Sequence, residues 1–237
     1  MTRALAIETS GRTGSVATVI DGSVAREEAF THGLQNAAKI LPIIDQLCRA
    51  QCWSPRDLDE IYLSIGPGSF TGLRIGVTLA KTIAFTCNSR ILAVPTVDVL
   101  VRNAPPDARN VVIVLDAKRD QIFTARFSRN ANDDWTAQEP AHLDVLAEML
   151  RRCPRPVHLI GEGIPFHQKF VPANDPGVIV TSPELWQARA EHVAQIGWRM
   201  SREKLFTDPD RLVPVYIRLP EAEEKWNAAR SVEINKP

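Results

Sequence analysis

The sequence predicts an α/β protein made of two duplicated units, each a mixed β-sheet flanked by helices. The first half shows three strand patterns followed by alternating helix and strand patterns, which is typical of a mixed sheet. The stretch 111–127 then repeats the pattern of 5–20, in which an apolar strand ends on an acidic residue and a short basic turn leads to an alternating strand. We therefore expect one domain over 1–104 and a second, smaller one over 105–237; the alternative is a chance likeness between two apolar hairpins.

Three predicted strands open the chain as a meander, over 4–9, 15–21 and 23–30. Asp21-Gly22, between the second and the third, is a strong signal for a two-residue hairpin turn. Apolar residues then recur at helical spacing over 34–52. Pro42 lies inside that helix and should bend it or move its start, because proline has no backbone N–H to donate.

Strand and helix patterns alternate from there to the end of the chain. Ser54 and Pro55 suit the start of a short helix. The other elements expected in the first half are a strand over 61–66, a helix over 71–86, a strand over 91–95 and a helix that Thr96 caps. In the second half we expect a helix over 142–152, strands over 157–163 and 177–181, and a long helix over roughly 183–205.

Composition narrows the class of protein. Apolar residues make up 44% of the chain and charged residues 24%, which is typical of a globular protein. Basic and acidic residues are equal at 28 each, so nucleic-acid binding by this chain alone is disfavoured. The N-terminus lacks the apolar run of a signal peptide, and no apolar span is long enough for a membrane helix. With four scattered cysteines, we expect a cytoplasmic, reduced protein.

A glycine-rich stretch, SIGPGSFTGLRIGVTLAKTIAF (64–85), follows one predicted strand and starts a helix. It is not a Walker A loop, because no lysine follows the glycines until Lys81. It is not a Rossmann fingerprint either, since its glycines give G-x-G-x-x-x-G. A nucleophile elbow around Ser69 would need glycine where Pro67 and Thr71 stand. The residues and their spacing therefore exclude all three of these known site motifs.

The same stretch predicts a close helix contact. Ser69 or Thr71 can cap the helix, on which Gly72, Gly76, Ala80 and Ala84 form a stripe of small residues. Such a stripe lets another helix approach closely, so we expect Gly72→Leu or Gly76→Leu to leave the monomer folded and abolish pairing. Arg74 lies in the first turn, where the helix dipole disfavours a cation. It pairs with an acidic group, completes an anion site or points into solvent.

Histidines and carboxylates suggest no catalytic centre. The five histidines lack the spacing of a helical metal site, and no activated nucleophile is evident. Glu8 and Asp116 each end the first strand of a half, and with Arg74 they could hold a magnesium-bound phosphate in a cleft between the halves. The favoured alternative is that each carboxylate orders its own turn, because the companion phosphate loops are missing.

Several segments resemble one known family. GPGSFTGLRIG (66–76), between a strand and a small-residue helix, resembles the signature of the TsaB family. The other similar segments, which together span most of the chain, are LAIETSGRTGSVA near the start, KILPIIDQL (39–47), DAKRDQIF (116–123) and PVYIR (214–218). The resemblance implies the fold of the actin/Hsp70-like ATPase superfamily, that is, two RNase H-like (ASKHA) domains.

The resemblance also implies a function and partners. Proteins of this family are the non-catalytic partner of TsaD, a metal-bearing paralogue that transfers a threonylcarbamoyl group to N6 of adenosine 37 in ANN-decoding tRNAs. A small ATPase, TsaE, joins them, and tRNA is contacted only through the complex. The chain is expected to form a homodimer in isolation and to bind no metal and no cofactor on its own, while ATP or ADP at the partner interface is left open.

The interface implied by the resemblance is formed by the helix that the glycine-rich motif begins (71–86) and by the helix over 34–52. Its expected residues are Asn36, Ile40, Gly66, Pro67, Gly68, Ser69, Phe70, Thr71, Gly72, Arg74, Ile75, Gly76 and Ala80. Three positions depart from the family pattern: Asn36 replaces a histidine, Asp120 a glycine and Gln121 a glutamate. The departures at 120 and 121 put any ligand role of the second-domain turn in doubt.

Two other functions are alternatives to this one. One is an independent enzyme, either an ATP-dependent phosphotransferase of the same superfamily or a metallopeptidase. The phosphotransferase needs a second phosphate loop, for which GEG (161–163) is too short, and the peptidase needs a metal or a nucleophile. The other is a homodimeric module unconnected with tRNA.

Overall fold

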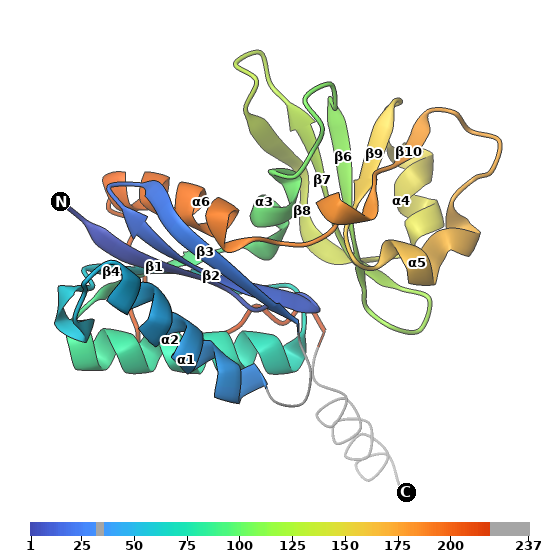
Figure 1. Ribbon diagram of the computed structural model, residues 1–237. Coiled ribbons are helices and arrows are strands. Elements are labelled where there is room, and N and C mark those ends of the chain that lie inside the picture. Colours follow the sequence, from blue (N-terminus) through green and yellow to red (C-terminus); the bar gives the residue numbers. More distant parts are fainter. Residues whose placement is uncertain (32–35, 219–237) are drawn as a thin grey trace, which may run out of the picture.

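Two five-stranded mixed sheets form the framework of the computed structural model, which describes residues 1–31 and 36–218 (Figure 1). The first sheet contains β1 (Arg3–Glu8), β2 (Thr13–Ile20), β3 (Ser23–Thr31), β4 (Glu60–Ser64) and β5 (Arg90–Val94). The second contains β6 (Asn110–Asp116), β7 (Ile122–Arg129), β8 (Trp135–Asp144), β9 (Val157–Ile160) and β10 (Val178–Val180). Their orders, β3-β2-β1-β4-β5 and β8-β7-β6-β9-β10, are the same arrangement, so the predicted duplication is confirmed at the level of the sheets.

The central strand of each sheet pairs in the same way. β1 is antiparallel to β2 and parallel to β4, with Ala6 opposite Ala17 on one side and Tyr62 on the other. β6 is likewise antiparallel to β7 and parallel to β9. Because each central strand ends at the same edge of its sheet, the turns that follow β1 and β6 are equivalent places in the two halves.

Helices cover both faces of the first sheet. The helices are α1 (Asn36–Ala50), α2 (Phe70–Cys87), α3 (Thr96–Val101), α4 (Leu146–Arg152), α5 (Ile164–His167) and α6 (Ala190–Arg202). α1 packs on β2 and β3, α2 packs on β4 and β5, and α6 crosses the opposite face (Figure 1). None of the helices in the described residues is long and apolar enough to span a membrane.

Alternation along β1 divides the core into layers. Leu5 and Ile7 point into a cluster with α1 and α2, whereas Ala4 and Ala6 point into a cluster with α6. The cluster on the α6 side also includes Val111 and other buried residues of the second sheet, so the two halves share one core. A third cluster lies under α4, on the far face of the second sheet.

α6 belongs to the second half in sequence, yet it packs on the first sheet. A Cβ placed on Gly197 would lie 2.3 Å from the ring of Tyr62, so the helix approaches the strand as closely as glycine allows. The buried carboxylate of Glu60 accepts hydrogen bonds from the Tyr62 hydroxyl (2.7 Å) and from Ser201 Oγ on α6 (2.8 Å). A division of the chain at residues 104 and 105 therefore stays a prediction.

Several predicted elements have different bounds. A helix was expected over 142–152, but α4 begins at Leu146 because β8 runs to Asp144. Pro140 in β8 hid this strand; an edge strand tolerates proline, which lacks an N–H to donate. The expected helix over 183–205 is divided into a 3-10 turn (Pro183–Leu185) and α6.

The first half follows its predicted elements closely. Asp21 and Gly22 both have positive φ (46° and 83°), as a tight hairpin turn requires. α1 runs through Pro42, and its predicted start at residues 34 and 35 lies outside the described residues. Thr96 does not cap α3; its hydroxyl accepts a hydrogen bond from the backbone N–H of Gly66 (3.1 Å) instead.

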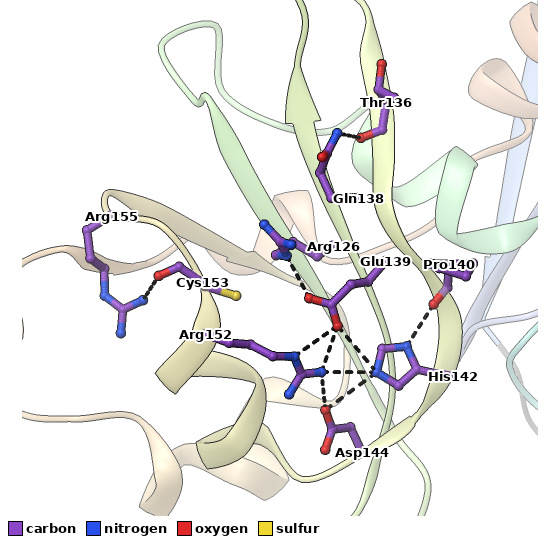
Figure 2. Close-up of polar contacts among 10 residues, drawn as sticks. All are labelled: Arg126, Thr136, Gln138, Glu139, Pro140, His142, Asp144, Arg152, Cys153 and Arg155. Atoms are coloured by element: carbon purple, nitrogen blue, oxygen red, sulfur yellow. Dashed lines mark hydrogen bonds and ion pairs between the residues drawn. The ribbon is translucent and has the colours of Figure 1, made fainter.

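A network of charged side chains ties β8 to α4 (Figure 2). Glu139 Oε1 accepts from Arg126 Nε (2.9 Å), and its Oε2 accepts from the guanidinium of Arg152 (2.8 Å). Arg152 also donates to Asp144 Oδ2 (2.5 Å) and lies 3.2 Å from His142 Nε2. The network holds α4 against the edge strand of the second sheet.

We expect Glu139→Gln to lower the free energy of unfolding by about 1 kcal/mol at pH 7. The hydrogen bond from Arg152, with help from Arg126, holds the pKa of Glu139 below its ordinary value. The contribution of Glu139 is therefore fully present above the pKa of an unfolded glutamate, about 4.3, and is lost as the pH falls through the lower folded value. Urea unfolding of both proteins at pH 7 and pH 3 measures it. A difference of the same size at both pH values would contradict the assignment.

Candidate partner interface and the neighbouring cleft

The glycine-rich motif forms a tight loop between β4 and α2. Gly66 has φ +111°, a conformation that favours glycine, and a Cβ there would lie 2.9 Å from the carbonyl oxygen of Val215. Ser69 caps α2 as predicted, because its Oγ accepts a hydrogen bond from the N–H of Gly72 (3.2 Å). The loop is thus held on one side by the cap and on the other by the C-terminal segment 213–218.

The motif glycines wrap around the turn that follows β1. A Cβ on Gly68 would lie 2.4 Å from the carbonyl oxygen of Ser10, and one on Gly72 would lie 1.9 Å from that of Thr9. A Cβ on Gly76 would lie 2.4 Å from Thr9 Oγ1. The prediction that the small-residue stripe faces a partner helix was therefore wrong in its geometry. Gly72, Gly76, Ala80 and Ala84 are all buried inside the chain, and the two glycines let α2 approach the end of β1.

Among the described residues, aromatic rings and not acidic groups hold Arg74. Its guanidinium carbon lies 3.8 Å from the centre of the Phe70 ring, and its Nε donates to the hydroxyl of Tyr216 (3.1 Å). The rings of Phe70 and Tyr216 are themselves 5.2 Å apart. This cluster fastens the C-terminal segment to the exposed side of α2.

An apolar groove of about 560 Å³ runs between α1 and α2. It is lined by Ile40, Leu41, Arg74, Ile75, Thr78, Leu79, Thr82, Ile83 and Thr86. The hydroxyls of Thr82 and Thr86 donate to backbone carbonyls one turn earlier in α2, at 2.8 and 2.9 Å. Because these hydroxyls are satisfied within the helix, the threonines add little polarity to the groove.

The surface around the groove is rich in exposed apolar side chains and poor in charge. Leu41 is 55% exposed and Phe85 is 91% exposed. Within α2, Arg74 and Lys81 are the sole charged residues, and there is no carboxylate. Depletion of charge together with exposed apolar groups is typical of the core of a protein–protein interface.

The predicted interface residues differ in how exposed their side chains are. Phe70, Thr71 and Arg74 are exposed, and Ile75 is half-buried on the groove. Ile40 is buried at the groove, and the side chain of Asn36 lies outside the described part of the chain. Other groove residues lie on the two helices expected to dock with the partner but were not predicted individually: Leu41, Thr78, Leu79, Thr82, Ile83 and Thr86. The absence of acidic residues over 70–87 was the available signal for them.

A second cavity, of about 660 Å³, lies between the two halves beside the motif. The first half lines it with the turn after β1 (Ser10, Gly11 and Arg12) and with residues 68–70. The second half lines it with residues 115–118, Phe123, Glu162, Gly163 and Phe166. Asp116 lines this cleft, whereas Arg74 lines the groove and Glu8 is fully buried.

The two strand-end carboxylates are engaged in their own turns. Glu8 Oε1 accepts from the N–H of Ser10 (2.5 Å), and burial raises the pKa of Glu8. Asp116 accepts from both the N–H (3.0 Å) and the Nζ (2.8 Å) of Lys118. Burial alone would raise the pKa of Asp116, but these hydrogen bonds outweigh it and leave the pKa lowered. This is the alternative that the sequence favoured, in which each carboxylate orders its turn.

The turn after β6 has an unusual backbone. Lys118, Arg119 and Asp120 all have positive φ, between 55° and 63°. Asp120, which stands where the family pattern has glycine, therefore keeps a conformation that glycine would favour. Arg218 donates to the Ala117 carbonyl oxygen and to Gln121 Oε1, so the C-terminal segment also holds this turn. In the described residues, no group of three or more His, Cys, Asp or Glu side chains could hold a metal ion.

Comparison with known proteins connects this geometry to a family. Residues 33–226 match the family model of TsaD, tRNA N6-adenosine threonylcarbamoyltransferase. The tRNA threonylcarbamoyladenosine biosynthesis protein TsaB of Bacillus subtilis is 31% identical over 94% of this chain and 96% of its own length. TsaB of Escherichia coli is 25% identical over 91% and 94%. A solved structure from Pseudomonas aeruginosa, described as similar to the peptidase YEAZ, has the same fold, with a TM-score of 0.78, 20% identity, and coverage of 92% of this chain and 100% of that one.

Proposed function

We propose that this chain, which belongs to the TsaB family, is a subunit of the machinery that makes N6-threonylcarbamoyladenosine in tRNA. Its partner is the catalytic, TsaD-like subunit that transfers the threonylcarbamoyl group to adenosine 37 of ANN-decoding tRNAs. This chain contributes no catalytic residue and acts as a scaffold that activates the partner.

One observation carries the proposal of a scaffold, namely the apolar groove between α1 and α2. This surface is apolar and carries little charge. A second protein that covers such a surface removes it from water, which stabilises the complex. Leu41 and Phe85 are large side chains that such a partner would bury. In isolation, a second copy of the chain covers the same groove and forms a homodimer.

The strand-end carboxylates support a non-catalytic role. Glu8 is buried and bonded to Ser10, and Asp116 is held by Lys118 and by His167 Nε2 (3.1 Å). Glu8 is out of reach of a substrate because it is fully buried, and Asp116 is held in an ion pair with Lys118, so neither is placed to serve as a general base. Chemistry in the complex then depends on the partner.

The remaining parts of the proposal follow from the family. Each half is an RNase H-like domain of the actin/Hsp70-like type, over 1–104 and 105–237, and the identical strand orders support this assignment. A TsaE-like ATPase joins the complex, tRNA is reached only through it, and the complex works in the cytoplasm. ATP or ADP, where present, binds at the interface with the partner and not to this chain alone.

Reconstitution tests the function directly. We expect the TsaD-like subunit, the TsaE-like ATPase and the threonylcarbamoyl-AMP synthase of the same organism, supplied with ATP, threonine and bicarbonate, to modify tRNA only when this chain is added. Mass spectrometry of digested tRNA measures the modified nucleoside. Equal modification with and without the chain, given active preparations of the other proteins, would sink the proposal.

A further inference from the structure

The turn between β1 and β2 presents backbone N–H groups to the cleft. Gly11 and Arg12 both line the cavity, and the chain reverses direction there between two antiparallel strands. Successive N–H groups in a turn form a concave site for an anion. In an ATPase-like fold, which the sequence resembles, a nucleotide phosphate is the ligand that such a turn would be expected to take.

A side chain from the other half of the protein already occupies this turn. Glu162 Oε2 accepts a hydrogen bond from the N–H of Arg12 (2.7 Å). Burial raises the pKa of the Glu162 carboxyl, and this hydrogen bond opposes the rise. A Cβ on Gly11 would lie 3.1 Å from the same oxygen, so the carboxylate lies close above the turn. Residues 150 positions apart are thereby joined across the cleft.

Two glycines, one on each side of Glu162, place its side chain against the β1–β2 turn. Gly161 has φ +136°, and a Cβ on it would lie 2.3 Å from the carbonyl oxygen of Val114. A Cβ on Gly163 would lie 2.5 Å from the backbone N of Asp116. The two glycines therefore let the loop after β9 lie directly on β6, and Glu162 between them extends toward the first half.

Arg12 is held at its other end by the same segment. Its guanidinium carbon lies 4.7 Å from the centre of the ring of Phe166, which belongs to α5. The backbone of Arg12 thus contacts Glu162 while its side chain contacts Phe166. Both contacts join the β1–β2 turn to the loop that carries GEG (161–163).

We propose that Glu162 is a built-in anionic ligand of the β1–β2 turn, which joins the two halves of the chain and excludes a nucleotide phosphate from that turn. A phosphate in this turn would need the N–H of Arg12, which already donates to Glu162. It would also collide with the Glu162 carboxylate, which lies close above Gly11. The residues present therefore do not fit a nucleotide at this position. The proposal is independent of the tRNA role, because it concerns the chain alone.

Amide hydrogen exchange of the full chain, followed by NMR, tests the joint. We expect Glu162→Ala to speed exchange of the Arg12 amide by roughly ten- to a hundredfold, because a charge-assisted hydrogen bond is lost. Glu162→Gln keeps an acceptor without the charge and should give a smaller acceleration, so it decides the matter if the alanine variant folds poorly. The exposed Glu184→Ala, in the same half, is the matched control and should change nothing at Arg12.

Three outcomes would overturn the proposal. The first is unchanged exchange of the Arg12 amide in both variants. The second is equal acceleration at the Gly163 amide, which donates to Val114 within the second half (2.9 Å), since that would mean that the loop itself had come apart. The third is a shift of the Arg12 and Thr13 resonances when magnesium and ATP are added to the wild-type chain. No shift at these amides is expected.

Discussion

Gly72→Ala is expected to lower the free energy of unfolding by about 3 kcal/mol, among the largest effects of any single methyl group added to this chain. The new Cβ would lie 1.9 Å from the carbonyl oxygen of Thr9, so either α2 or the end of β1 must move. Since the obstacle is backbone, no change of rotamer relieves it. Urea unfolding followed by circular dichroism measures the loss.

Gly76→Ala serves as the graded comparison. Its Cβ would meet the hydroxyl of Thr9 at 2.4 Å and Leu63 Cδ1 at 3.1 Å, which are side-chain atoms that can turn aside. We expect a smaller loss than at Gly72, and Thr9→Ala in the same chain should recover part of it. If Gly72→Ala were as stable as the wild type, the close approach of α2 to Thr9 would be contradicted.

Leu41→Asp is expected to weaken association with the TsaD-like partner at least a hundredfold while leaving the fold intact. A carboxylate in the covered groove would lose its water and replace an apolar contact, a cost of about 3 kcal/mol. Because Leu41 is 55% exposed in the free chain, its replacement removes little from the core. Isothermal titration with the partner measures the affinity, and light scattering measures the homodimer.

Leu205→Asp is the matched control for the groove. Leu205 is 52% exposed, almost the same as Leu41, but it lies just after α6 and away from α1 and α2. We expect it to bind the partner normally. Equal affinity of the wild type and Leu41→Asp, or equal weakening by the two variants, would show that the groove between α1 and α2 is not the interface.

The sheets could be predicted from the sequence because their signals are local. The apolar alternation of β1 and β2 and the turn at Asp21 and Gly22 lie within a few residues of each other, and the second half repeats them. β8 was missed because Pro140 interrupts an edge strand that is only partly buried. The place of α6 could not be predicted, since it depends on the contact of Gly197 with Tyr62, residues far apart in the chain.

The site shows the same limit. Sequence reasoning found the stretch 66–76 but assigned its glycines to a partner, because spacing along a helix does not tell which side faces the core. The groove itself joins α1 to α2 across more than thirty residues, and its apolar character depends on threonine hydroxyls that bond to their own helix. The sequence places Glu162 in a loop that is too short for a phosphate site. Its contact with Arg12 joins residues 150 positions apart, so only the fold reveals it.

The return of α6 to the first sheet has a consequence for how this molecule can be divided. Although its two sheets repeat one plan, a gene cut between them would yield a first fragment with the Tyr62 face of its sheet bare, and a second fragment carrying the helix meant to cover it. Neither fragment would have a complete hydrophobic core on its own. The native core would form only when the two fragments associate. The two sheets are therefore alike in topology, but α6 makes the folding of one half depend on the other.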